Sequence, residues 1–365
     1  MSLHGIRTVA RLELTQRVRA SRWPLVLGVW VVVIGGITWL TWAAVNDEDF
    51  NQGPILYDVV TFCVLGLGML IVPSLTATSI NGDREHGVLA TLQTTLLTAA
   101  DIVVGKLVAA WAVAMVFLAT ALPFLAFAWL AGGLNAGRIA ASLLVLALVL
   151  AVVCAIGLMF SALTVRPVAS AVLTYLTVAA FVFGSVISFG MAYFLVAADE
   201  TVSVRYVRDD FWTEQEQSFP KPETEAEMEE WNPPQPTAAD CVVTTEVREV
   251  GHTERIWWLL PLNPFVVVAD VAPPTPSTST YNAFTPMTWI SRGARLAKAG
   301  PPEVYDDCAA NFLPTAQDAE ETTATSPVWP FGLAFLLAAG VGAAALTRKR
   351  IETPIRRLPK GTRIA

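Results

Sequence analysis

The chain has 365 residues, of which 54% are hydrophobic and only 15% are charged. This composition excludes an ordinary soluble domain and indicates a protein that buries its apolar surface in lipid. The formal net charge of −7 is the sum of separate acidic and basic segments. The basic residues lie in short segments beside apolar runs, and nothing in their placement favours nucleic-acid binding.

The first segment, residues 1–23, carries five arginines and one acid, Glu13. Apolar residues repeat every four positions from Ile6 to Val18, which predicts an amphipathic helix lying at the headgroup level of a membrane. The alternative is a plain cytoplasmic charge anchor. The apolar run that follows is too long for a secretory signal peptide.

Six apolar runs are each long enough to cross a hydrocarbon core of about 30 Å. Five of them fill residues 24–198 and the sixth fills residues 327–347. Pro73 and Pro123 predict kinks in the second and third runs. The predicted fold class is an all-α membrane protein with six transmembrane helices, an N-terminal interfacial helix, a cytosolic coupling helix and a large extracellular insertion between spans five and six.

The insertion, residues 199–326, has 22 acidic and 8 basic residues, a net charge of about −14. Alternating residues at 241–250 predict a strand within it. Residues 214–236 are polar enough to predict a loosely ordered stretch. Residues 257–271 are apolar but short and twice interrupted by proline, which favours a surface-lying or re-entrant segment over another span.

The orientation is predicted from arginine and lysine in the short segments. The N-terminal segment has five and the basic tail, residues 348–365, has seven. We therefore expect a multi-pass protein of the cell membrane with both termini in the cytoplasm and the acidic insertion outside.

The four cysteines divide by environment. Cys63 and Cys154 lie within apolar runs and are expected to be packing residues. Cys241 and Cys308 are the two in the insertion, where an oxidising compartment allows a disulfide to persist. We expect these two to pair, the alternative being two free thiols.

Catalytic chemistry has little support in the sequence. Gly105-Lys106 lacks the upstream glycine and the hydroxyl of a P-loop, and no metal site or catalytic pair can be assembled. We expect no enzyme activity and no cofactor in this chain. The spans lack charged residues at mid-depth apart from Asp58, which argues against an ion-coupled carrier and suits an apolar or amphipathic cargo.

Residues 81–106 form the one sizeable polar interruption in the first half of the chain. Apolar residues recur at helical spacing from Val88 to Val103. Thr98 and Asp101 form a capping-box pattern that would start a new helix. The segment predicts a short helix along the membrane surface, a turn, and a helix that enters the membrane. An ordinary solvated loop is the alternative.

This segment resembles the coupling segment of ABC-2 type permeases, the membrane-spanning subunits of bacterial ABC exporters. The resemblance departs at Ala90 and Leu96, where that family often has glutamate and usually has proline. A Gly-Lys pair, here Gly105-Lys106, ends the motif. The matching residues, which the resemblance implies couple the chain to an ATPase, are Asp83, Arg84, Glu85, Gly87, Leu89 and Leu92.

The resemblance implies partners that supply what this chain lacks. It implies two copies of a separate ABC ATPase, which hold ATP and magnesium, and a second permease chain as homo- or heterodimer, in contact with membrane lipids. The position of the insertion resembles the disulfide-bearing external loop of sterol and drug half-transporters. The alternative function is a non-transporting membrane scaffold or sensor whose extracellular domain binds a ligand.

Overall fold

The computed structural model describes residues 2–18, 23–45, 52–85, 97–211, 213, 236–272, 285–308 and 326–352. They fall into two compact units. The first unit contains Met1–Ser188, Trp258–Ala294 and Pro327–Ala365, and the second contains Phe189–Trp257 and Arg295–Ser326. Residues 258–294 thus belong to the first unit, although they lie within the insertion expected from sequence. The domain boundaries expected from sequence remain a prediction.

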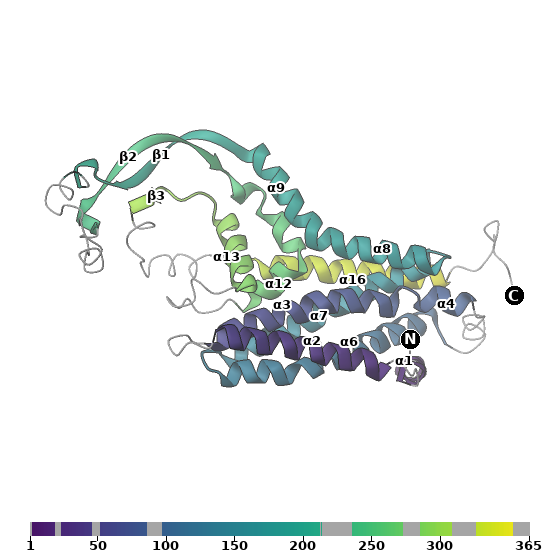
Figure 1. The fold of residues 1–365 in the computed structure, drawn as a ribbon. Coiled ribbons are helices and arrows are strands. Elements are labelled where there is room, and N and C mark those ends of the chain that lie inside the picture. The colour runs from purple at the N-terminus through teal and green to yellow at the C-terminus, as the bar shows by residue number, and fades with distance from the viewer. Residues whose placement is uncertain are drawn as a thin grey trace. The chain divides into compact units, whose positions relative to one another are not determined.

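The first unit is built from helices (Figure 1). They are α1 (Leu3–Val18), α2 (Trp23–Ala44), α3 (Gln52–Thr76), α4 (Ser79–Glu85), α6 (Ala99–Leu130), α7 (Ala136–Leu163), α8 (Pro167–Ala179), the π-helix η1 (Ala180–Gly184), α9 (Ser185–Val196), the 3-10 helix η4 (Trp257–Leu262), α12 (Pro264–Val271), α13 (Pro286–Ala299) and α16 (Trp329–Glu352). α9, η4 and α13 each continue into the second unit.

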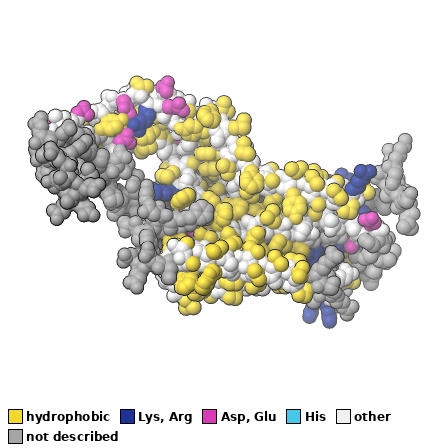
Figure 2. Space-filling view, in the orientation of Figure 1, with side chains coloured by type: hydrophobic (Ala, Val, Ile, Leu, Met, Phe, Trp, Pro, Cys, Tyr) yellow, Lys and Arg dark blue, Asp and Glu magenta, His cyan; other side chains and the backbone are white. Residues whose placement is uncertain are grey.

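Six helical segments of the described residues are long and apolar enough to cross a membrane. They are Trp23–Ala44, Gln52–Glu85, Ala99–Leu130, Ala136–Leu163, Pro167–Val196 and Trp329–Glu352. The coarse prediction is therefore confirmed, and the chain is a mainly helical multi-pass membrane protein. Hydrophobic side chains cover most of the visible face of these helices (Figure 2).

A local sequence signal starts α6 where it was expected. The Thr98 side chain accepts a hydrogen bond from the Asp101 amide, and the Asp101 carboxylate accepts one from the Thr98 amide, so the predicted capping box begins α6. Asn135 caps α7 without a capping box, because only its side chain takes part and accepts from the amide of Gly137.

The core of the first unit lies between α3, α6 and α7. In each of these helices, more than half of the most apolar stretch is buried. Residues such as Leu65, Ala121 and Leu146 are almost fully buried there. α2 and the α8–α9 segment are mostly exposed, and large apolar side chains such as Val32 and Phe194 face outward from them. This distribution fits helices whose outer faces contact lipid.

The apolar run at residues 257–271 is divided by its prolines. Pro261 lies within η4, and Pro264 occupies the first turn of α12. α12 has eight residues and rises about 12 Å, far less than the hydrocarbon core. A surface-lying or re-entrant position for this run remains a prediction.

The second unit contains a three-stranded sheet in the order β2-β1-β3. β1 (Ala197–Val207) pairs antiparallel with β2 (Cys241–Gly251) along its whole length and parallel with the short β3 (Val304–Asp306). The strand expected at residues 241–250 is thus confirmed as β2. The polar stretch expected at residues 214–236 lies outside the described residues, apart from Pro236.

Candidate functional site

The proposed coupling segment begins in α4, directly after α3. Asp83, Arg84 and Glu85 lie in the last turn of this helix. The other three predicted coupling residues, Gly87, Leu89 and Leu92, lie outside the described residues. The geometry of the site is therefore that of its two ends, α4 and the start of α6.

A buried lysine joins those two ends. Lys106 of α6 is 1% exposed, and its ammonium group forms an ion pair of 2.6 Å with a carboxylate oxygen of Asp83. The same ammonium group pairs with the carboxylate of Glu13 in α1. It also donates to the backbone oxygen of Ser79 at 3.2 Å. One lysine thus connects three segments that are far apart in the sequence.

Arg17 adds a second basic side chain beside Glu13, one of the two acids that contact Lys106. Its guanidinium lies 4.0 Å from Glu13 and donates to the backbone oxygen of Leu75 at 2.8 Å. We call Glu13, Arg17, Asp83 and Lys106 the buried ion cluster, after the buried Glu13 and Lys106, whereas Arg17 and Asp83 are half-buried. The cluster holds two acids and two bases. Such charges are tolerated away from water only when each one has a partner, because desolvation of an unpaired ion is costly.

α1 also packs directly on α6. A Cβ atom added at Gly105 would lie 2.7 Å from the Cβ of Val9 and 3.0 Å from the backbone oxygen of Ile6. The Ser2 amide donates to the Asp101 carboxylate at 2.7 Å. The glycine of the Gly-Lys pair is therefore the point of close helix approach, and the lysine is the point of charge pairing.

α4 is fixed on its other side to the end of α7. The hydroxyl of Ser161 accepts from the amides of Ile80 and Asn81, and Arg84 donates to the backbone oxygen of Ala162 at 3.3 Å. Glu85 is exposed, and no ion pair or hydrogen bond is found for its side chain among the described residues. Of the three charges in α4, two hold the turn and the third is available at the surface.

Asp83 and Lys106 lie near opposite ends of one sequence motif, and nothing in the pattern predicts that they pair. Glu13 stands out in the sequence only as the single acid among five arginines. Glu13 is a lone acid in a basic helix, and Lys106 is a lone lysine at the start of an apolar helix. Two such isolated charges are natural partners, and this was the available signal. Their distance in sequence hid the pairing.

Two buried carboxylates lie elsewhere in the first unit. Asp58 of α3 accepts from the amides of Met287 and Thr288, at the start of α13, at 3.0 and 3.1 Å. Asp270 of α12 accepts from the amides of Val328 and Trp329, at the start of α16. Each carboxylate thereby caps a helix that comes much later in the chain. The sequence singled out Asp58 but gave no role to Asp270.

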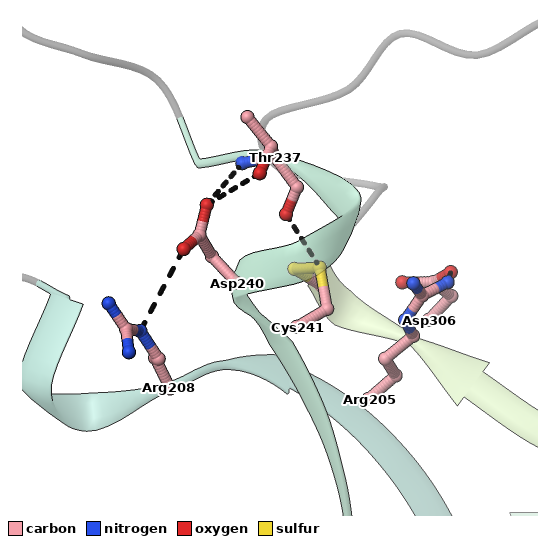
Figure 3. The surroundings of a disulfide bond; sticks show 7 residues. Arg205, Arg208, Thr237, Asp240, Cys241 and Asp306 are labelled. Atoms are coloured by element: carbon pink, nitrogen blue, oxygen red, sulfur yellow. Dashed lines mark hydrogen bonds and ion pairs between the residues drawn. A yellow bond between two sulfur atoms is a disulfide. The ribbon is translucent and has the colours of Figure 1, made fainter.

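The second unit carries the predicted disulfide. Cys241 and Cys308 are bonded, with Cα atoms 6.1 Å apart, so the pairing is confirmed. Figure 3 shows the capping residues beside it, where Thr237 donates to the Asp240 carboxylate and thereby lowers the pKa of that acid. Arg205 pairs with Asp306 at 3.2 Å and supports the parallel contact between β1 and β3.

An arginine near the disulfide ties the sheet together. Arg248 of β2 donates to Asp307 at 2.9 Å, and this hydrogen bond raises the pKa of the Arg248 guanidinium above its ordinary value. The guanidinium also lies 5.2 Å from the ring centroid of Tyr305 in β3. These contacts join the outer strands on either side of β1.

No group of three or more histidine, cysteine, aspartate or glutamate side chains suited to a metal ion occurs among the described residues. A scan against protein-family models finds no match for the chain, and a search of the curated proteins finds none either.

Proposed function

We propose that this chain is the permease subunit of an ATP-driven ABC exporter, similar to the ABC-2 type. In this proposal it forms the pathway for an apolar or amphipathic substrate such as a lipid or drug. Two copies of a separate ATPase hydrolyse ATP with magnesium, and a second permease chain completes the pathway.

The ion pair between Asp83 and Lys106 is the observation that supports this proposal best. It closes the base of the polar segment between α4 and α6, so that a force on the segment acts on both helices together. The buried ion cluster extends the same connection to α1 through Glu13. A plain solvated loop would not need a buried lysine at its base, because burying the charge costs free energy.

The exposed charges at this end of the first unit suit a contact with another subunit. Glu85 is free to pair with a basic residue of the ATPase, whereas Arg84 is held against α7. Leu89 and Leu92 are proposed to form the apolar ridge that seats in the ATPase, and Gly87 to permit close backbone approach. Their contribution is inferred from the resemblance.

The sidedness of the chain follows from the positive-inside rule. α1, α4 and the end of α16 lie at the same end of the first unit (Figure 1), and basic side chains are visible there (Figure 2). We propose that this end faces the cytoplasm and that the acidic insertion is outside. Single cysteines introduced at Ser2 and Thr362 should react only with membrane-permeant maleimides in whole cells.

Coupling is tested by two substitutions in the proposed contact. Glu85→Lys reverses the exposed charge, and Leu92→Asp places a charge on the apolar ridge. Losing one buried charged hydrogen bond at an interface typically costs about 2–5 kcal/mol, which applies to Glu85→Lys. Leu92→Asp instead buries an unpaired charge in an apolar contact. Both variants should therefore lose co-purification of an ATP-hydrolysing subunit and cargo-stimulated hydrolysis. Membrane insertion should be unchanged.

Glu249→Lys is the matched control, because it reverses an exposed glutamate of β2 in the second unit, outside the proposed contact. It should keep assembly and stimulation. If Glu85→Lys and Leu92→Asp also keep wild-type assembly and stimulation, the segment is only a loop. The scaffold or sensor function would then describe the chain better.

A further inference from the structure

A small cavity lies beside Asp58, at the beginnings of α3, α7 and α13. Its volume is about 40 Å³, which is room for about three water-sized positions. Most of its wall is apolar, with contributions from Pro54, Val268 and Met287. The polar side chains that line it come from α3, from the beginning of α7 with its cap Asn135, and from Thr288 of α13.

Asp58 is the charged group at the base of this cavity. It is 5% exposed and lies within an apolar helix. Its oxygens accept from the amides of Met287 and Thr288, but no lysine, arginine or histidine of the described residues lies within ion-pair distance. A buried carboxylate in a membrane helix is costly unless a cation or donor neutralises it, and such a residue marks a functional site by default.

Thr61 supplies an independent observation. It lies one turn further along α3, lines the same cavity and is 5% exposed. Its hydroxyl oxygen is fully buried beside the Tyr57 hydroxyl, and no partner among the described residues meets it with good hydrogen-bond geometry. The neighbouring Tyr57 hydroxyl is engaged with Ser142. A buried hydroxyl without a partner is unfavourable, so the cavity favours an occupant that provides one.

We propose that this cavity binds the protonated amine end of an amphipathic molecule. A primary ammonium group is small enough for the cavity and has three donors, which suit the Asp58 carboxylate and the Thr61 hydroxyl. The apolar wall then contacts the first carbons of the tail. The proposal deepens the export function by naming a class of cargo, but the site can bind an amine without an ATPase.

Arg138 provides a discriminating feature at the edge of the cavity. Its exposed guanidinium would repel an ammonium group and attract an anionic headgroup. Arg138→Gln should therefore leave amine binding unchanged or make it tighter. If the occupant were instead an anion held by Arg138, the same substitution would weaken it.

The test uses the full chain in detergent micelles at pH 7 and an eight-carbon primary amine that carries an aliphatic diazirine. After illumination, labelled peptides are mapped by mass spectrometry. Labelling should fall on α3, α7 and α12–α13, and octylamine should compete at least tenfold better than octanol, which has the same tail without the charge.

Two variants separate the contribution of the Thr61 hydroxyl from that of the Asp58 charge. Thr61→Val keeps the shape of the side chain and should weaken octylamine binding about threefold to tenfold, the usual effect of one hydrogen bond. Asp58→Asn should weaken it more than tenfold, because the charge is lost. Thr38→Val is the control, since that buried hydroxyl donates to the backbone oxygen of Ile34 and lies in α2.

Equal competition by octanol and octylamine would overturn the proposal, as would wild-type binding by both Asp58→Asn and Thr61→Val. Competition by octyl sulfate that depends on Arg138 would replace it with an anion site. Thr61→Val leaves the Asp58–α13 contacts intact, so the proposal stays testable even if Asp58→Asn unfolds. If no ATPase co-purifies but the amine still binds, the export function fails and this site stands.

Discussion

Lys106 of α6 and Asp83 of α4 form an ion pair of 2.6 Å that closes the base of a polar segment between two membrane helices. The lysine is almost completely buried, and Glu13 of α1 approaches its ammonium group from another segment. Lys106 therefore connects α1, α4 and α6 directly. Removing the Lys106 side chain should therefore destabilise the folded chain more than removing the side chain of a surface lysine.

Lys106→Met should destabilise the chain by about 3 kcal/mol, because the half-buried Asp83 loses its cation and the buried Glu13 keeps only Arg17 at 4.0 Å. Thermal unfolding in detergent micelles measures the loss. Arg11→Gln is the control, since Arg11 is exposed on α1. Adding Asp83→Asn to Lys106→Met should cost less than the sum of the single changes, because the two residues interact directly. Strict additivity would contradict the ion pair.

Gly105→Ala should weaken the attachment of α1 to α6. The added methyl group would lie 2.7 Å from the Cβ of Val9, and the backbone of α1 must move to relieve the clash. Faster hydrogen exchange in residues 3–18 would report the detachment. Gly36→Ala is the matched control in α2, where the new methyl group meets nothing within 4 Å and the helix should gain stability slightly. Equal exchange in both variants would refute the close approach.

The spans and the capping box could be predicted because each depends on local information, and the disulfide because Cys241 and Cys308 are the two cysteines of the insertion. Long apolar runs identify spans, and Thr98 with Asp101 starts α6 ahead of the apolar run that begins at Leu107. The first turns of α6 contain Asp101 and Lys106, which a hydropathy pattern treats as the boundary of a span. The structure buries both, because partners from α1 and α4 satisfy them.

What the sequence did not predict depends on contacts between distant segments. The π-helix at Ala180–Gly184 interrupts the fifth span without proline or a change in hydropathy. Asp270 caps α16 from α12, and no local pattern marks an acid that serves a helix beginning more than fifty residues later. The candidate coupling residues are local in sequence, but the ion cluster that holds one of them, Asp83, is not.

The disulfide should matter most to the short strand β3. β1 and β2 pair along eleven residues each, whereas β3 pairs with β1 through only three. Cys241 and Cys308 close a loop with a separation of 67 residues, worth about 4 kcal/mol in the chain-entropy model. Replacing both with serine should speed hydrogen exchange at residues 304–306 while β1 and β2 remain protected.

Cys63→Ser is the control for that experiment, because Cys63 is a free cysteine in α3. It should leave exchange in the second unit unchanged. Equal loss of protection in all three strands would show that the disulfide holds the whole sheet. No loss at residues 304–306 would show that Arg205 and Arg248 hold β3 without it.

His252 should make the second unit more stable in mildly acidic solution. Its two ring nitrogens lie 3.0 Å from Glu200 and 2.9 Å from Glu254, and both can donate only when the ring is protonated. These hydrogen bonds raise the pKa of His252 above that of a free histidine, about 6.5, although Arg255 opposes them. The protonated form is therefore favoured more strongly in the folded state than in the unfolded state.

Because the folded pKa is the higher one, the stabilisation is complete below about pH 6.5 and is lost as the pH rises through the raised pKa. The thermal unfolding of the full chain is compared between wild type and His252→Gln from pH 5.5 to 8.5. Wild type should be more stable at the acidic end, and the difference should shrink towards the alkaline end. His4→Gln, which changes an exposed histidine on α1, should show no such trend. A difference that stays constant with pH would mean that His252 acts by packing and not by its charge.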